Sequence, residues 1–470
     1  MLSRVWSLLV RQRWWALALW AGVCLALGAH GWSWKIFYDG TQLFLGGHPS
    51  DLPGPGGLHI YASEPMLQTG PLTFLVAAPL ISLGLVTSFQ VAAVGMTVLG
   101  LGVVRLLEGW ALGLASGQPA RARTQAATFV LGLVFVPAWV NLAAWYGHLD
   151  DALALAFAVL AVRATTARRP MLLGLLLGLA VVSKPVAIAF LPLVLVLPRR
   201  EWWRSMGVGA AVVGLAAAPF LLAAPQTLSA AGGFRIPVEA GSVLRLLGVT
   251  AAATPPWDRP VQLLLALALG LVAVRRGRWP AVLLLAVDAR ILLDPSVNTY
   301  YAAWLLVGTA TWDLWRAGGS SDRTGLRAPL SLLGFLMLFV PALSPVASVV
   351  GATGQAWLRA AFVIGSAVAV LVGPGRSDSP CPQLQPAGAW RTDPDLISAA
   401  GAVGADGRKR GASVLTDAAS SGHTPSVDLR RGRVETTARQ PLVAAAESRS
   451  LRHPQSDDGD TVIGSRRPGS

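Results

Sequence analysis

Acidic side chains that could act as a general base are confined to a few short segments of an otherwise apolar chain. Asp39 follows the aromatic segment Trp32–Tyr38 and precedes Gly40. Low dielectric and nearby charge can tune the pKa of a carboxylate in such surroundings, which suits it to deprotonate a hydroxyl group. Placed just past a helix end, Asp39 could instead cap a short helix over residues 40–45, and the two roles are compatible.

A second group of titratable residues, His148, Asp150 and Asp151, falls within four positions at the start of a predicted helix. The helix dipole favours acids there. The group could bind an acceptor hydroxyl, a sugar or a divalent cation, or the aspartates could simply cap the helix. Because three residues so close in sequence rarely all converge on one ion, we assign no metal ligand and leave a divalent cation as an open alternative.

Lys184 is the third candidate, because it interrupts the apolar stretch Met171–Leu197 and is followed by Pro185. An ionisable residue at such depth is costly and marks a functional-site hypothesis. Two short helices meeting here would direct the ammonium towards the outer membrane interface, where the phosphate of a lipid could be its counter-ion. The alternative is a lysine that extends to the interface from an ordinary turn.

The composition indicates what kind of fold must position these residues. The chain has 470 residues, 53% of them hydrophobic and 13% charged, which excludes a single soluble globule. Apolar runs of roughly 15 to 25 residues recur from Trp14 to Val372, and such runs can cross about 30 Å of hydrocarbon as helices. They are continuous instead of alternating, which excludes an outer-membrane barrel. We predict an all-α, polytopic membrane protein.

The net charge of +14 sets the topology. In a soluble protein it would suggest a nucleic-acid partner, but here the arginines mark cytoplasmic loops, and we expect no nucleic acid. The positions of these arginine-rich loops predict a chain with about twelve spans (11 to 13) and both termini in the cytoplasm. We therefore expect a multi-pass protein of the plasma membrane. The predicted spans are 14–30, 89–107, 126–143, 150–163, 171–183, 185–198, 205–224, 261–275, 280–293, 301–316, 329–349 and 357–373.

The remaining segments complete the predicted organisation. Residues 1–373 form the membrane domain, with a long first outer loop at 31–70 and a re-entrant or interfacial segment at 71–86. Residues 374–470 are rich in Gly, Pro, Ser, Asp and Arg, which predicts a disordered cytoplasmic tail. Most acids of the membrane domain fall on the outer side. Two explanations fit this distribution. The acids are simply excluded from the arginine-rich cytoplasmic loops, or they belong to an active site that faces away from the cytosol.

Three motifs in order resemble the glycosyltransferase C superfamily, and more narrowly its bacterial polyprenyl-phosphate-sugar-dependent mannosyltransferase-like branch. The first has a Y-D-G-x-x-L-x-x-G-G-x-P-like pattern, followed by Y-x-x-x-P and Ala-Pro-Leu. Its residues are Tyr38, Asp39, Gly40, Leu43, Gly46, Gly47, Pro49, Tyr61, Pro65, Ala78, Pro79 and Leu80. The other two span Trp145–Leu155 and Gly174–Pro185. Together they cover residues 10 to about 320.

The resemblance implies an inverting transfer of a sugar, most simply mannose, from a polyprenyl-phosphate donor to a lipid or glycan acceptor on the outer face of the membrane. It implies that Asp39 is the catalytic base and that Lys184 binds the donor phosphate. Residues that would position the substrates are Glu64, His148, Asp150, Asp151 and Tyr300. The chain has no Walker A loop and no Rossmann fingerprint, which disfavours a nucleotide-sugar donor.

Two other classes of function fit the same sequence. A transporter or lipid flippase would use the outer charges as a substrate or proton path, and would show paired broken helices. A non-catalytic relative could keep the motifs without the activity. Near the later spans, we expect Asp288 and Arg290 to form an internal ion pair.

Overall fold

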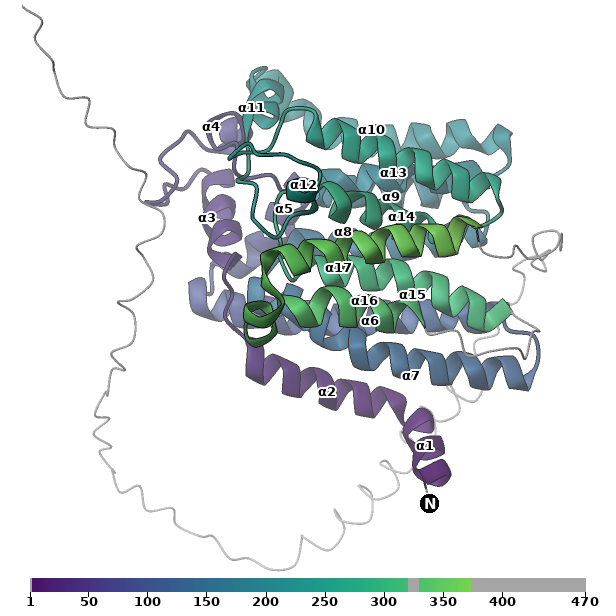
Figure 1. Ribbon diagram of the computed structural model, residues 1–470. Coiled ribbons are helices and arrows are strands. Elements are labelled where there is room, and N and C mark those ends of the chain that lie inside the picture. Colours follow the sequence, from purple (N-terminus) through teal and green to yellow (C-terminus); the bar gives the residue numbers. More distant parts are fainter. Residues whose placement is uncertain (1, 320–328, 373–470) are drawn as a thin grey trace, which may run out of the picture. The chain divides into compact units, whose positions relative to one another are not determined.

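The computed structural model describes residues 2–319 and 329–372, and these form a bundle of helices (Figure 1). Within that part of the chain the structure contains helices and a single isolated bridge, between Pro237 and Ala253, but no strand. The predicted all-α class is therefore confirmed. The prediction of a disordered tail at 374–470 falls outside the described residues.

The first half of the bundle contains ten α-helices and three stretches of other helix type. They are α1 (Leu2–Arg11), α2 (Arg13–Gly28), α3 (Trp34–Phe44), η1 (Gly57–His59), α4 (Ile60–Ser63), α5 (Pro71–Ile81), α6 (Leu85–Leu114), α7 (Gln118–Val140), η2 (Asn141–Tyr146), α8 (Leu149–Thr166), α9 (Pro170–Ser183), η3 (Pro185–Val196) and α10 (Arg199–Ala223).

The second half continues the bundle with shorter elements between the long helices. They are α11 (Thr227–Gly233), α12 (Val243–Leu246), α13 (Asp258–Arg275), η4 (Trp279–Ala281), α14 (Val282–Leu293), α15 (Tyr301–Gly319), α16 (Leu330–Gly334), η5 (Phe335–Phe339), η6 (Val340–Ala342) and α17 (Ser344–Val372).

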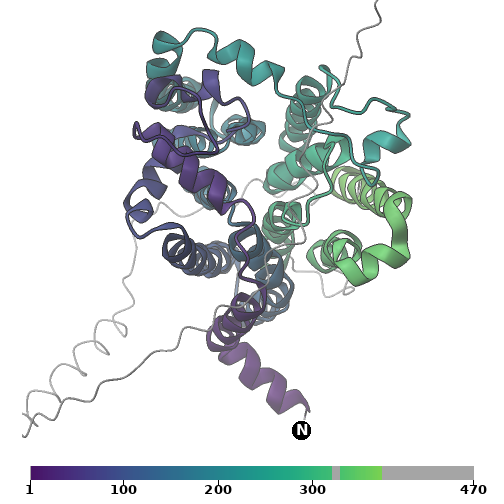
Figure 2. The same ribbon diagram turned by 90° about the vertical axis from the view of Figure 1, so that its left-hand side faces the viewer.

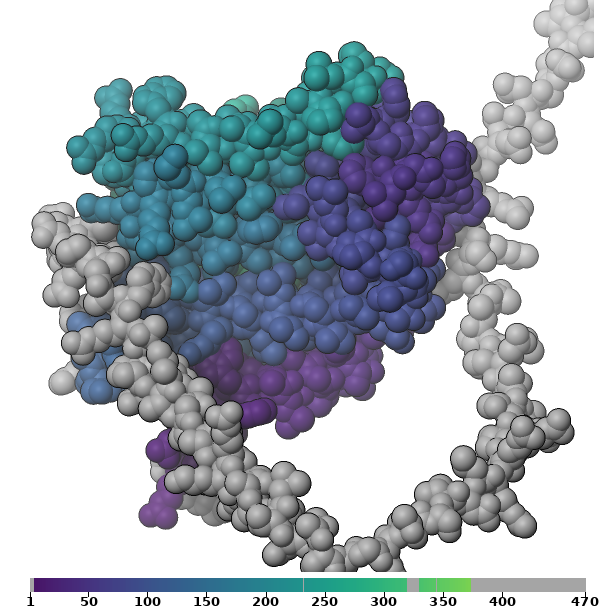
Figure 3. Space-filling model, turned by 180° about the vertical axis from the view of Figure 1, so that it is seen from behind, coloured from purple at the N-terminus to yellow at the C-terminus, as the bar shows by residue number. Residues whose placement is uncertain are grey.

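Within residues 2–319 and 329–372, four helices are long and apolar enough to cross a membrane, judged by length and composition: α6, α7 extended by η2, α10, and α17 from Pro345. Helix α10 lies along the top edge of the bundle in Figures 1 and 3, and its apolar residues are largely exposed, with Leu222 at 83%. An apolar surface of this kind is stable against lipid and not against water. These apolar helices support a membrane-embedded protein, while the count of about twelve crossings stays a prediction.

The two ends of the bundle differ in the segments that they carry. Helices α3, α4, α11 and α12 lie at one end, which faces the viewer in Figure 2, and α1 lies at the other (Figures 1 and 2). We call these the α3 end and the α1 end. By the arginine pattern, the α3 end corresponds to the predicted outer side and the α1 end to the cytoplasmic side.

Close packing in the bundle depends on glycine. A Cβ atom at Gly174 of α9 would lie 2.0 Å from the carbonyl oxygen of Ser205 in α10, and one at Gly178 would lie 2.8 Å from Val212. Two small residues four positions apart let neighbouring membrane helices approach closely. Helix α9 also packs on α8, so this contact fixes the helix that carries Lys184 at its end.

Helix α5 occupies the segment predicted to be re-entrant or interfacial. Its eleven residues rise only about 17 Å, which is less than the hydrocarbon thickness. Gly84, at φ 76°, separates it from α6. The backbone N–H of Gly70 donates to the carbonyl oxygen of Ser183 at 2.9 Å, so α5 begins against the end of α9.

Several predicted spans have a different geometry in the structure. Residues 185–196 form the 3₁₀ helix η3, because Pro185 and Pro192 lack the N–H that an α-helix uses. The span predicted at 329–349 was too long. Helix α16 passes into the π-helix η5 and the 3₁₀ turn η6, which ends at Ala342 next to Pro341. Helix α17 then begins at Ser344 and is kinked at Gly351, where φ is 69°.

Candidate functional site

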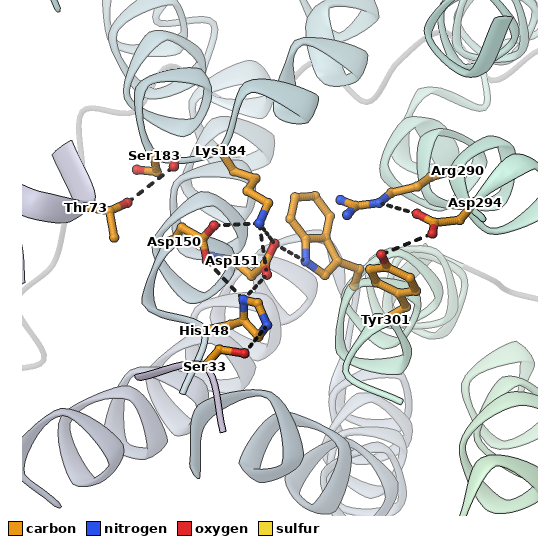
Figure 4. Close-up of polar contacts among 11 residues, drawn as sticks. Ser33, Thr73, His148, Asp150, Asp151, Ser183, Lys184, Arg290, Asp294 and Tyr301 are labelled. Atoms are coloured by element: carbon orange, nitrogen blue, oxygen red, sulfur yellow. Dashed lines mark hydrogen bonds and ion pairs between the residues drawn. The ribbon is translucent and has the colours of Figure 1, made fainter. Parts of the chain in front are cut away.

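The break between α9 and η3 places a lysine beside two buried carboxylates. Lys184 has extended backbone angles (φ −141°, ψ 110°), as is common before a proline. Its Nζ lies 2.5 Å from Oδ2 of Asp150 and 3.4 Å from Asp151 (Figure 4). Two helices therefore meet at Lys184, as the sequence predicts, and the ammonium is paired inside the bundle.

The two aspartates lie in the first turn of α8, which begins after an irregular segment. The π-helix η2 ends at Tyr146, and the next residue, Gly147, reverses the chain with a φ of 77°. A Cβ atom at Gly147 would lie 3.2 Å from Trp34, so both the backbone angle and the close approach favour glycine. This geometry turns His148 back over the start of α8, where its Nδ1 lies 3.4 Å from Asp150 and 3.2 Å from Asp151.

The cluster of His148, Asp150 and Asp151 has the donor set of a metal site. One ligand atom from each lies within 4.8 Å of the others. Imidazole and carboxylate are ligands that divalent transition metals accept. The three residues thus converge, against the expectation that residues so close in sequence do not. However, Lys184 already supplies a positive charge at Asp150, and a bound cation would have to displace it.

Trp304 of α15 joins this cluster to a second polar group. Its Nε1 donates to Oδ1 of Asp151 at 3.1 Å, and the guanidinium of Arg290 lies 5.3 Å from its ring centroid. Arg290 pairs with Asp294 at 3.5 Å, and the hydroxyl of Tyr301 donates to Asp294 at 3.2 Å. The two groups form one continuous network of buried charges, visible in Figure 4.

Aromatic rings close the cluster on the side of His148. The ring centroid of Tyr300 lies 4.2 Å from that of His148 and 4.5 Å from that of Tyr301. Phe37 of α3 lies 5.9 Å from the same histidine. At the other nitrogen of the imidazole ring, the Oγ of Ser33 lies 3.3 Å from the His148 Nε2. Tyr300 is therefore part of the cluster, and its role in positioning substrate stays a prediction.

The network leaves some buried polar atoms without a hydrogen bond. Nη1 of Arg290 has no partner, and Nδ1 of His148 is close to both aspartates but is not aligned to donate to either. Buried polar groups are nearly always hydrogen-bonded in folded proteins. These unpartnered nitrogens, beside carboxylates and an ammonium, give the site the means to bind hydroxyl groups or a phosphate.

Asp39 lies within helix α3, so the prediction that it stands past a helix end and caps residues 40–45 is wrong. Helix α3 begins at Trp34 and runs through the position of the predicted cap. Asp39 is buried and pairs with Lys35 one turn earlier, and Lys35 also lies 3.0 Å from Asp51. The hydrogen bond from the Lys35 ammonium lowers the pKa of the exposed Asp51 carboxyl.

Asp39 belongs to a different group from Lys184, although the two are linked through α5. A Cβ atom at Gly40, next to Asp39, would lie 2.9 Å from Phe74 of α5. The neighbouring Thr73 donates its hydroxyl hydrogen to the carbonyl oxygen of Ser183 at 3.3 Å (Figure 4). Both groups are therefore at the α3 end, but no contact joins the two side chains in the described part of the chain.

Glu64 lies outside both groups. It follows the last residue of α4, and its Oε1 accepts the backbone N–H of Gly54 at 3.1 Å. A Cβ atom at Gly54 would approach that same oxygen to 2.9 Å. This contact fixes the loop 49–57 and gives Glu64 a structural role in the free protein.

The predicted pair of Asp288 and Arg290 does not form. Residues two apart on a helix point to nearly opposite sides. Asp288 instead accepts a hydrogen bond from the hydroxyl of Ser366 in α17 at 2.8 Å, while Arg290 faces Asp294. The i, i+4 spacing of Arg290 and Asp294 was the available sequence signal for the pair that does form.

No protein-family model matches the chain, and no match is found among the curated proteins or the solved structures.

Proposed function

We propose that this chain transfers a sugar, most simply mannose, from a polyprenyl-phosphate donor to a lipid or glycan acceptor at the outer face of the plasma membrane. The observation that supports the proposal best is the pairing of Lys184 with Asp150 and Asp151 at a helix break inside an apolar bundle. A charged cluster in such a place is costly, and function is the usual reason for its presence. The resemblance of three motifs to glycosyltransferase C enzymes supports the same reading.

The proposed reaction is a single inverting displacement. The carboxylate of Asp39 takes the proton of the acceptor hydroxyl, and the hydroxyl oxygen forms a bond to the anomeric carbon of the donor sugar. The bond between that carbon and the phosphate oxygen breaks, and polyprenyl phosphate leaves with the bonding electron pair. Lys184 stabilises the negative charge that develops on the phosphate.

The pairing of Lys184 sets a condition on this mechanism. In the free protein its ammonium contacts Asp150 at 2.5 Å, so a phosphate must compete with that carboxylate. Arg290 offers an unused N–H close to the same network. We propose that the phosphate is bound between Lys184 and Arg290, and that Tyr300, His148 and the two aspartates of α8 contact hydroxyl groups of the substrates.

A transporter or lipid flippase is the second candidate, and one observation favours it. The described residues contain more broken helices than the sequence indicates: η2 and η5 are π-helical, η3 is a 3₁₀ helix, and α17 is kinked at Gly351. Broken helices around a buried polar site are typical of secondary transporters. A transporter moves its substrate unchanged, whereas a transferase makes a new glycosidic bond, so product analysis separates the two.

The test is a transfer assay with the full-length chain in lipid nanodiscs. The donor is polyprenyl-phosphate mannose with a labelled sugar, and the acceptors are membrane glycolipids. We expect a labelled glycolipid from the native chain and a loss of about 10²- to 10⁴-fold in Asp39→Asn, the usual contribution of a general base.

The matched control is Asp51→Asn, because Asp51 contacts the same Lys35 ammonium but is exposed. This control should keep the native rate. An equal loss of transfer activity in both variants would mean that the pairing with Lys35 supports folding and that Asp39 is not the base. The absence of any labelled product from the folded native chain would refute the transferase proposal for this donor.

A further inference from the structure

The α1 end of the bundle contains a cavity of about 460 Å³ that the proposed sugar transfer does not use. Three helices, α6, α7 and α8, form it. Its lining residues are Arg105, Leu106, Gly109, Leu112, Gly113, Arg121, Gln125 and Arg163. The volume is many times the ~30 Å³ share of one water molecule and lies in the range of small-molecule sites.

The charges in this lining are all positive. Three of the eight lining residues are arginines, and none is acidic. The guanidinium groups of Arg121 and Arg163 make no hydrogen bond or ion pair with any residue of the described ranges. Arg105 donates to Glu108 at 2.8 Å, but that buried carboxylate is already shared with Arg13 at 2.6 Å. Among the described residues, the cavity therefore carries an excess of positive charge without a counter-ion.

The cavity is separate from the candidate site for sugar transfer. Helix α8 connects them, with Asp150 in its first turn and Arg163 in its last. The two positions are thirteen helical steps apart, which corresponds to about 20 Å. An anion bound at Arg163 therefore lies far outside contact with Lys184, on the side that the arginine pattern predicts to be cytoplasmic.

Guanidinium groups that line one cavity, with no acidic residue in its lining, favour a particular ligand chemistry. The planar fork of arginine matches the oxygens of a phosphate and binds them with two parallel hydrogen bonds. The rest of the lining comprises Gln125 and an apolar wall of leucine and glycine, which suits the glycerol part of a headgroup better than a highly charged polymer. Basic pockets between membrane helices on the cytoplasmic side commonly bind anionic headgroups.

We propose that the cavity lined by Arg105, Arg121 and Arg163 binds a phosphate group, carried by an anionic phospholipid headgroup or supplied as soluble phosphate. Arg121 and Arg163 make the direct contacts, because their guanidinium groups have no other partner among the described residues. Arg105 adds positive charge at the rim while it stays paired to Glu108. This site is independent of whether the chain transfers sugar.

The experiment measures binding to the full-length chain in neutral detergent micelles. Phosphatidylglycerol is titrated in one arm and inorganic phosphate in the other, and bound ligand is counted by native mass spectrometry. The test variant is Arg121→Gln/Arg163→Gln, with Arg163→Gln alone as a milder second variant. The matched control is Arg199→Gln/Arg200→Gln, which removes the same charge from an exposed turn outside the cavity on the same predicted side.

We expect saturable binding to the native chain and to the control, and an affinity at least about tenfold weaker in the test variant, the effect of losing one hydrogen bond to a charged group. Binding of the lipid alone assigns the site to a headgroup, and equal binding of inorganic phosphate assigns it to a free anion.

An equal weakening of binding in the test and control variants would overturn the proposal, because the effect would then come from general surface charge. Unchanged binding in both variants would overturn it too, because the cavity arginines would then make no contribution. Unchanged elution and helix content show that a variant is folded.

Discussion

Buried ion pairs lie at both ends of this bundle, and they differ in how fully their polar atoms are satisfied. At the α1 end, Glu108 is fully buried, and each of its oxygens accepts a hydrogen bond from one arginine, Arg13 or Arg105. At the α3 end, Lys184 lies between two carboxylates, while His148 and Arg290 each keep a buried nitrogen without a hydrogen bond.

Hydrogen-bond partners separate the two kinds of buried charge in this molecule, structural and functional. A buried carboxylate with a partner for each oxygen is complete in the free protein, and its role is to hold helices α2 and α6 together. A cluster with donors left over has capacity for a ligand. Buried charge alone therefore does not identify a site, since both clusters have it. The clusters differ because both carboxylate oxygens of Glu108 are hydrogen-bonded, whereas His148 and Arg290 each keep a buried nitrogen without a partner.

The largest effect on stability is expected at the α1 end. Glu108→Gln leaves the buried Arg13 without its counter-ion, and breaking a buried pair in this way costs about 3–5 kcal/mol of unfolding free energy. Reversible unfolding in mixed micelles measures it. The control Arg105→Gln should cost about 0–1 kcal/mol, because the Arg105 side chain is 61% exposed. If Glu108→Gln and Arg105→Gln lose the same unfolding free energy, Glu108 is not the structural acid that the two arginines share.

A smaller effect is expected where Trp304 joins the two polar groups of the α3 end. Trp304→Phe keeps an aromatic ring beneath Arg290 but removes the hydrogen bond to Asp151. We expect a loss of about 1.5–3 kcal/mol of unfolding free energy, the range for a hydrogen bond to a charged group. A double-mutant cycle with Asp151→Asn checks it: additive losses would show that the two residues are not coupled.

The smallest effect is expected at the exposed pair of Asp51 and Lys35. The pKa of Asp51 is lowered by Lys35, so the folded state favours the ionised carboxylate. Its stabilisation is present above the unfolded pKa of about 3.9 and is lost as pH falls through the depressed folded pKa. The melting temperature of Asp51→Asn should thus lie slightly below that of the native chain near neutral pH and converge with it in strong acid. A constant difference at all pH values would show that the carboxylate charge is not responsible.

Much of the architecture was predictable because the membrane restricts the backbone to helices. Continuous apolar runs predicted the all-α class, and the sequence Lys184-Pro185 predicted the break that carries the lysine. The acids at positions 150 and 151 were correctly placed at the start of a helix, and α5 has the short length expected of a re-entrant segment. These features depend on local sequence and on hydrocarbon thickness.

The remaining features depend on contacts between distant segments, which no local pattern specifies. Trp304 reaches Asp151 across 153 positions of the chain, and Ser366 reaches Asp288 across 78. The expected pair of Asp288 and Arg290 failed because nearness in sequence was taken for nearness in space. Asp39 was misplaced for a related reason: the aromatic residues from Trp34 to Phe37 pack into the bundle as a helical face, so the helix starts earlier than the Asp-Gly pair suggests.

Sugar transfer by two single variants, one at each end of the bundle, tests most directly whether the Lys184 cluster is the site of transfer and the Glu108 cluster a structural one. Lys184→Met and Arg105→Met each remove one cation from a carboxylate cluster, at opposite ends of the bundle. With labelled polyprenyl-phosphate mannose and folded protein, we predict a loss of about 10²- to 10³-fold in Lys184→Met, the usual effect of removing a group that stabilises developing charge. Arg105→Met should transfer at the native rate. Native transfer by Lys184→Met, or an equal loss in both variants, would contradict the account.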